Sequence, residues 1–130
     1  MKTKEIKMKL GKNLSEEIFY NALCNGLSLM QGYELEFSYD IEEYKKSRNK
    51  LENPCWEEVL MQMLKDGYKL TLIDEGCEGE YTRSITIEDV HERVENTELP
   101  HLINMINEQD DCNTADAILQ TTFFEEIIFG

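Results

Sequence analysis

The segment from Asp74 to Glu80 carries the densest group of potential metal ligands in this sequence, and it reads Asp-Glu-Gly-Cys-Glu-Gly-Glu. Four carboxylates and two glycines within one short segment are typical of the start of a calcium loop, where oxygen ligands surround a sharp bend. Asp74 and Gly79 fit the first and sixth positions of that motif. Gly76, however, replaces the second oxygen ligand, and Ile85 stands where a bidentate glutamate is required. We therefore interpret residues 74–80 as a solvated hairpin loop, with weak cation binding as the alternative.

The second candidate for chemistry is His91, which stands close to Asp89 and Glu92. Neighbouring carboxylates orient an imidazole and favour its charged form, as in a general base. The sequence has no H-E-x-x-H pattern, and the nearest hydroxyl, on Ser84, is not part of a G-x-S-x-G turn. The seven glycines form no phosphate-binding loop either. A structural histidine on a short helix is therefore favoured over a catalytic one.

The cysteines do not have the spacing of a metal site. They are Cys24, Cys55, Cys77 and Cys112. No two of them are closer than 22 positions, and the two histidines, His91 and His101, are ten positions apart. Structural zinc sites usually take two ligands from one short turn. The lysine-rich start is not followed by the apolar run of a secretory signal. We therefore expect partly buried free thiols in a cytoplasmic protein, without a metal or a cofactor.

Charge is the most unusual property of the composition. The 130 residues include 27 acidic and 13 basic side chains, for a net charge of −14. Residues 1–12 carry a net charge of +4 and residues 13–130 a net charge of −18; within 74–126, only Arg83 and Arg93 oppose fifteen acidic residues. Such a chain repels phosphates, which disfavours direct binding to nucleic acid or anionic lipid. No apolar run reaches the ~18 residues that a membrane span needs.

Alternation of apolar and polar residues predicts the strands. The clearest alternation runs over residues 33–39, where an apolar face opposes a face with two glutamates. Residues 68–74 and 80–86 are rich in β-formers, and the glycine-containing segment 75–79 joins them as in a hairpin. Residues 2–10 also alternate, so we expect residues 2–12 to form either a basic edge strand or a basic arm.

Apolar residues at helical spacing predict the helices. The longest pattern covers 14–30, although Gly26 is a potential early stop, and Asn53-Pro54 is typical of the start of the next apolar helix. Further helical patterns cover 41–51, 86–95, 98–106 and 113–127. Because strands and helices do not alternate strictly, we predict an α+β fold in a single domain, residues 1–130. Its small, mainly antiparallel sheet of three to four strands packs against four to five helices.

The C-terminal segment is unusually apolar for a chain end, where loose polar residues are common. The favoured interpretation is that Phe123 and Ile127 close the core, because a chain of this size needs its aromatic residues inside. The alternative is that Phe124, Ile128 and Phe129 face outward and form a patch for self-association or for a partner.

The sequence thus leads to three functional hypotheses. The first is a noncatalytic acidic binding or accessory protein that meets a protein partner, basic in character, through a surface with apolar anchors. The second is an acidic mimic of nucleic acid, in which a line of carboxylates including Glu98 imitates phosphates and inhibits a DNA- or RNA-binding protein. The third is a small enzyme with an unrecognised site of carboxylates and histidine. The residues expected to contact a partner are Glu78, Glu80, Glu88, Glu92, Glu95, Phe124 and Phe129.

Overall fold

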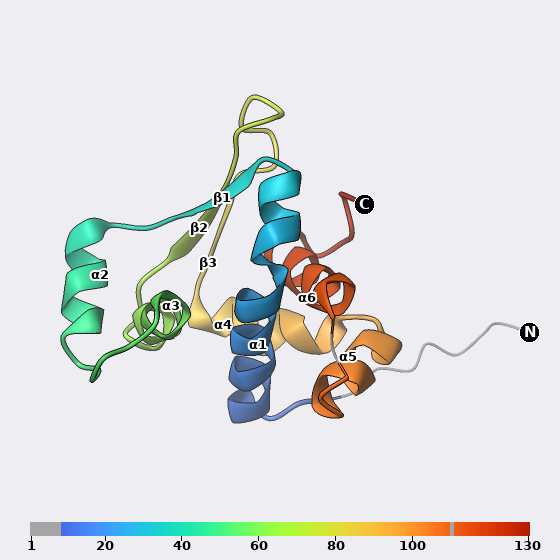
Figure 1. Ribbon diagram of the computed structural model, residues 1–130, viewed down its shortest axis with the longest axis horizontal. Helices are drawn as coiled ribbons and strands as arrows, with labels where there is room; N and C mark the ends of the chain where they lie inside the picture. Colours follow the sequence, from blue (N-terminus) through green and yellow to red (C-terminus); the bar gives the residue numbers. More distant parts are fainter. Residues whose placement is uncertain (1–8, 110) are drawn as a thin grey trace, which may run out of the picture.

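The computed structural model describes residues 9–109 and 111–130, and these contain six α-helices and three strands. The predicted α+β fold is confirmed (Figure 1). The predicted strand or arm at 2–12 falls mainly on residues 1–8, which lie outside the described residues. In chain order the elements are α1 (Lys12–Gly32), β1 (Leu35–Ser38), α2 (Ile41–Arg48), α3 (Trp56–Lys65), β2 (Leu70–Asp74), β3 (Arg83–Ile85), α4 (Ile87–Arg93), the 3-10 helix η1 (Val94–Asn96), α5 (Leu99–Ile106) and α6 (Cys112–Phe124).

The sheet is antiparallel, with strand order β1-β2-β3. Leu35 pairs with Asp74, and Leu70 pairs with Ile85. Along β1, Leu35 and Phe37 are buried while Glu36 is exposed, as the alternation predicted. The strands are shorter than the predicted segments. Strand β1 begins only at Leu35, because the backbone of Glu34 adopts a φ of 61° and leaves the extended region.

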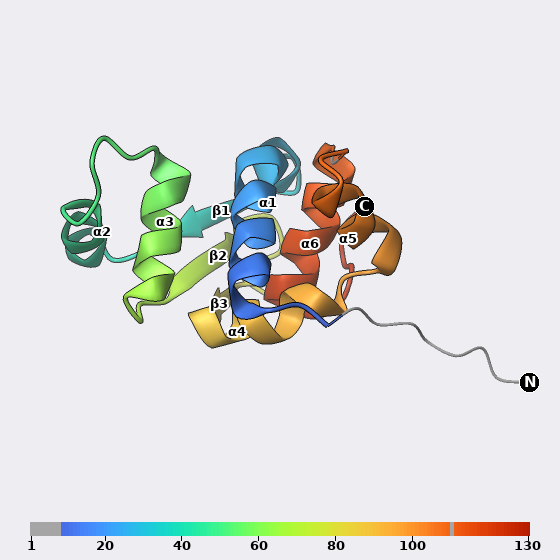
Figure 2. The same cartoon turned by 90° about the horizontal axis from the view of Figure 1, so that it is seen from below.

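Helix α1 lies between α3 on one side and α5 and α6 on the other (Figure 1, Figure 2). Its buried Phe19 contacts Phe123 of α6, with 6.3 Å between ring centroids, and Phe123 also meets Phe37 of the sheet at 5.8 Å. The helix does not end at the potential stop, Gly26, but continues to Gly32. At Gly26 the absence of a side chain permits a close contact with α6, because a Cβ there would lie 2.7 Å from Leu119 Cδ1.

The helices begin at different kinds of residue. The Thr86 side chain caps α4, accepting from the Asp89 N–H. Helix α1 begins after Gly11, without a hydrogen bond from a capping side chain. Helix α3 begins after Cys55 rather than after Asn53, since Asn53 has a φ of 47°. At α6, Asp111 accepts from the Thr114 N–H and provides the cap.

The C-terminal segment folds back onto α6. Phe123 and Phe124 are both buried, whereas Ile127, which was expected to help close the core, is 50% exposed. Phe129 stacks on Tyr33 at 5.2 Å and meets Tyr81 edge-on at 5.4 Å. Two consecutive phenylalanines are buried together because α6 is enclosed on nearly all sides, so that a single apolar stripe does not describe it.

Candidate functional site

Asp74 organises the hairpin loop that the sequence singled out. Its carboxylate is 2% exposed and accepts three backbone N–H groups: Gly76 and Cys77 at 3.0 Å on Oδ1, and Tyr81 at 3.1 Å on Oδ2. Burial alone would raise the pKa of Asp74, but these hydrogen bonds hold that pKa below its usual 3.8. Both oxygens are thus occupied by the loop's own backbone, and within the described residues no group of three potential ligands could hold a metal ion.

The Asp74 interactions predict a specific pH dependence of stability. A carboxylate whose pKa is lower in the folded state stabilises the fold above its unfolded pKa of about 3.8 and loses this contribution as the pH falls through the folded value. We expect Asp74→Asn to be destabilised at pH 7, and the difference from the wild-type free energy of unfolding to shrink as the pH falls below 3.8. Urea unfolding at a series of pH values measures this difference, with Glu78→Gln in the same loop as control. A difference that stays constant with pH would contradict the assigned role of the charge.

Further carboxylates crowd the end of this hairpin. Glu75 shares a hydrogen bond with Glu36, which raises the pKa of Glu75, and the nearby charge of Glu34 adds to the effect. Both Glu34 and Glu78 have positive φ, a conformation that is uncommon for residues other than glycine. Among the ion pairs found in the described part of the chain, none includes any of these four glutamates.

The predicted partner-binding residues do not form one continuous surface. Glu78 and Glu80 lie on the hairpin loop, while Glu88 and Glu92 lie on α4 at the opposite end of β3 (Figure 1). Glu95 is half-buried in η1, where its carboxylate accepts the Leu10 N–H at 3.4 Å.

The two predicted aromatic anchors belong to the packed tail. Phe124 is only 7% exposed and Phe129 is half-buried. Phe124 lies 6.0 Å from Phe129 and 6.4 Å from Tyr81, measured between ring centroids. In this conformation both side chains contact residues of the chain itself, and their role in binding a partner stays a prediction.

His91 takes part in an ion-pair cluster whose other members the sequence did not reveal. Its Nε2 lies 2.7 Å from Glu16 Oε2, and Lys65 Nζ lies 3.6 Å from the other oxygen of the same carboxylate. The cluster therefore joins α4, α1 and α3. Because the three side chains satisfy one another, a structural link between helices explains them without a reaction.

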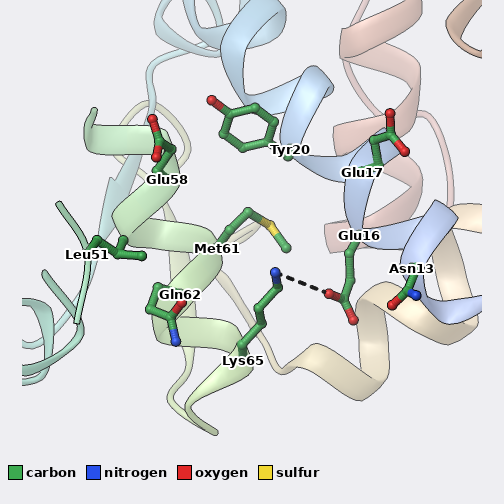
Figure 3. A pocket seen from close by; sticks show the side chains of 9 residues that line it. All are labelled: Asn13, Glu16, Glu17, Tyr20, Leu51, Glu58, Met61, Gln62 and Lys65. Atoms are coloured by element: carbon green, nitrogen blue, oxygen red, sulfur yellow. Dashed lines mark ion pairs between the residues drawn. The ribbon is translucent and has the colours of Figure 1, made fainter. Parts of the chain in front are cut away.

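A hollow of about 390 Å³ opens beside this cluster, between α1 and α3. Figure 3 shows the Lys65–Glu16 ion pair near one end of the hollow, Met61 in the middle, and Tyr20 and Glu58 toward the other end. Its lining is mixed, with apolar side chains on the α3 side and carboxylates on both helices. The lining residues are Asn13, Glu16, Glu17, Tyr20, Leu51, Glu58, Met61, Gln62 and Lys65.

A second hollow of about 310 Å³ lies further along α1, against β1 and the start of α3. Its lining combines aliphatic and aromatic side chains with the polar groups of Gln31 and Glu36. Trp56 forms part of the wall, where its indole N–H donates to the Tyr39 hydroxyl at 2.8 Å and its ring meets Phe37 edge-on at 5.9 Å. The lining residues are Leu27, Gln31, Leu35, Glu36, Phe37, Tyr39 and Trp56.

The two hollows follow one side of α1. Positions 13, 17, 20, 24, 27 and 31 alternate in spacing between four and three residues, which places them in one row along a helix. Five of these six residues line a hollow. At 1.5 Å per residue the row is about 27 Å long. We call the two hollows and the row between them the α1 groove.

A contact between two helices separates the hollows. The Tyr20 hydroxyl lies 3.6 Å from the sulfur of Cys55, at the N-terminus of α3, and it also hydrogen-bonds with Cys24 of α1.

The four cysteines were expected to be partly buried, but all four are exposed free thiols, because they lie at helix ends, on a loop or on the open side of α1.

The rim of the α1 groove is predominantly acidic. Glu17, Glu36 and Glu58 are exposed carboxylates that line the hollows. Lys65 is the cation in the lining of the first hollow, and its charge is paired with Glu16. The apolar side chains that line the hollows, together with these exposed carboxylates, suit a ligand that combines apolar side chains with positive charge.

Within the described residues, no helix is both long and apolar enough to cross a membrane. Comparison with protein-family models, with curated proteins and with solved structures gave no match.

Proposed function

We propose that the chain is a noncatalytic cytoplasmic binding protein whose α1 groove takes up a basic amphipathic helix of a protein partner. The observation that carries this proposal is the α1 groove itself, with two partly apolar hollows in a row and exposed glutamates around them. An amphipathic helix places apolar side chains on one face, and such helices bind other proteins by laying that face into an apolar groove. The length of the row, about 27 Å, corresponds to roughly 18 residues of helix.

Charge supports a basic rather than an acidic partner. The net charge of the chain is −14, which steers cationic ligands toward the protein. At the groove, lysine or arginine side chains flanking the apolar face would meet Glu17, Glu36 and Glu58. The four free thiols also fit a reducing compartment.

A synthetic peptide tests the proposal. The probe is a fluorescein-labelled 14-residue peptide made of two copies of Leu-Lys-Lys-Leu-Leu-Lys-Leu, with two comparison peptides that replace every Lys by Glu or every Leu by Ala. We expect saturable binding of the Lys/Leu peptide by fluorescence anisotropy, and weaker binding of both comparison peptides. Neutralising the rim with Glu17→Gln, Glu36→Gln and Glu58→Gln together should weaken binding at least about tenfold, since each exposed pair contributes roughly 0.5–1 kcal/mol.

The matched control is the triple variant Glu78→Gln, Glu88→Gln and Glu92→Gln, which changes the net charge equally on the surfaces that the sequence had suggested. We expect this control to reduce affinity by less than about threefold, through the long-range field alone. Equal losses in the two triple variants, or a larger loss in the control, would show that the groove is not the binding site.

A further inference from the structure

The middle of the α1 groove brings two thiols from different helices to one hydroxyl group. Tyr20 OH lies 3.6 Å from Cys55 Sγ. Hydrogen bonds with Cys55 and then with Cys24 are the two largest causes that raise the pKa of Tyr20 well above its usual value. Both sulfurs are therefore within hydrogen-bonding reach of the same oxygen atom.

The Tyr20 hydroxyl contacts both thiols, and the Cys55 thiol also donates to Glu58 Oε1 at 3.2 Å. Helices α1 and α3 pack directly against each other, and both cysteines are exposed. Tyr20 is half-buried at the edge of the first hollow, so that its ring has space to rotate toward solvent.

We propose that Cys24 and Cys55 are a site of reversible disulfide formation, at which a low-molecular-weight disulfide oxidises both thiols and closes the middle of the α1 groove. Formation of the bond does not depend on the proposed function, but its consequence for binding rests on that function. A disulfide between α1 and α3 would displace Tyr20 and join the two helices at the point where the hollows meet, where a bound helix would have to cross.

The reaction is a pair of thiol–disulfide exchanges. In the first, a protein thiolate attacks one sulfur of glutathione disulfide, forms a mixed disulfide and releases one glutathione thiol. In the second, the other protein thiolate attacks the mixed disulfide and releases the second glutathione. Two protein thiols are oxidised and one glutathione disulfide is reduced, and the two protons leave on the glutathione products.

Disulfide mapping tests the proposal on the full chain. The protein is incubated with glutathione disulfide, free thiols are alkylated, and tryptic peptides are identified by mass spectrometry. The four cysteines fall on different tryptic peptides, which span 13–45, 51–65, 70–83 and 94–130. We expect 13–45 joined to 51–65 as the main product, in protein that stays monomeric. The bond should also form in Cys77→Ser/Cys112→Ser and be absent in Cys24→Ser.

The control cysteines define the result that would overturn the proposal. If Cys24 and Cys55 carry only glutathione adducts, or if links to Cys77 or Cys112 form in comparable yield, no specific site exists. Oxidation of Cys77→Ser/Cys112→Ser should also weaken binding of the Lys/Leu peptide at least about fivefold, and reduction should restore it. If the disulfide forms while the affinity for the Lys/Leu peptide stays unchanged, the proposal that the disulfide closes the groove is wrong. If the reduced protein does not bind the peptide at all, the proposed function fails, and the mapping still decides whether the disulfide site exists.

Discussion

Replacing Gln120 with leucine is expected to lower the free energy of unfolding by about 2–4 kcal/mol and to release the C-terminal segment from α6. The Gln120 side chain is completely buried and makes four hydrogen bonds. Its Nε2 donates to Asp116 Oδ1 at 2.9 Å and to the Phe129 carbonyl at 3.0 Å. Its Oε1 accepts the backbone N–H groups of Ile128 at 2.8 Å and Phe129 at 2.9 Å.

Leucine has a similar size but no polar atoms, so it would leave these groups unpaired in a buried site. The segment would then have to leave α6 for its backbone to be hydrated, and Phe129 would lose its contacts with Tyr33 and Tyr81. Urea unfolding followed by circular dichroism measures the effect. Gln109→Leu, at an exposed position, makes the same chemical change and should alter stability by less than about 0.5 kcal/mol. Equal stabilities of the two variants would refute the role of Gln120.

Replacing Gly26 with valine is expected to destabilise the fold by about 3 kcal/mol, although valine is intrinsically the better helix former. A Cβ at this position would lie 2.7 Å from Leu119 Cδ1 and 3.2 Å from Ala115 Cβ. Leu119 and Ala115 are both completely buried, so the extra methyl groups can be accommodated only if α1 and α6 move apart.

The matched control is Gly32→Val at the end of the same helix, where no atom lies within 4 Å of an added Cβ. We expect the control to change the free energy of unfolding by less than about 0.5 kcal/mol, as urea titration can show. If Gly26→Val were as stable as Gly32→Val, the close contact between α1 and α6 would be contradicted.

The parts of the fold that the sequence predicted correctly are those set by residues close to one another in the chain. Alternation over 33–39 predicted which side chains of β1 are buried, because strand geometry alone sets that period. The Thr86 cap was recognisable for the same reason, since both partners lie within one turn. The role of Gly26 was not visible in the sequence, because it depends on α6, about ninety positions later in the chain.

The candidate site was harder to predict because it is assembled from three elements. Trp56 is the first residue of α3, and nothing in the sequence placed it beside Leu27 or Glu36. Asp74 was recognised as a special residue, but carboxylates that bind cations and carboxylates that bind backbone N–H groups have the same sequence pattern. A recognisable signal was the row of positions along α1, which mixes polar and apolar residues opposite the buried face.

Binding of a basic amphipathic helix in the α1 groove can be followed residue by residue in a nuclear magnetic resonance titration. Trp56 is the single tryptophan of the chain and lines the second hollow, so its indole N–H gives one assignable signal. On addition of the unlabelled Lys/Leu peptide, we predict that this signal shifts together with the backbone amides of residues 13–31 and 55–65. The amides of α4 and of the hairpin loop 75–80 should move little. Shifts confined to α4 or to the hairpin loop, with the Trp56 signal unchanged, would contradict binding in the groove.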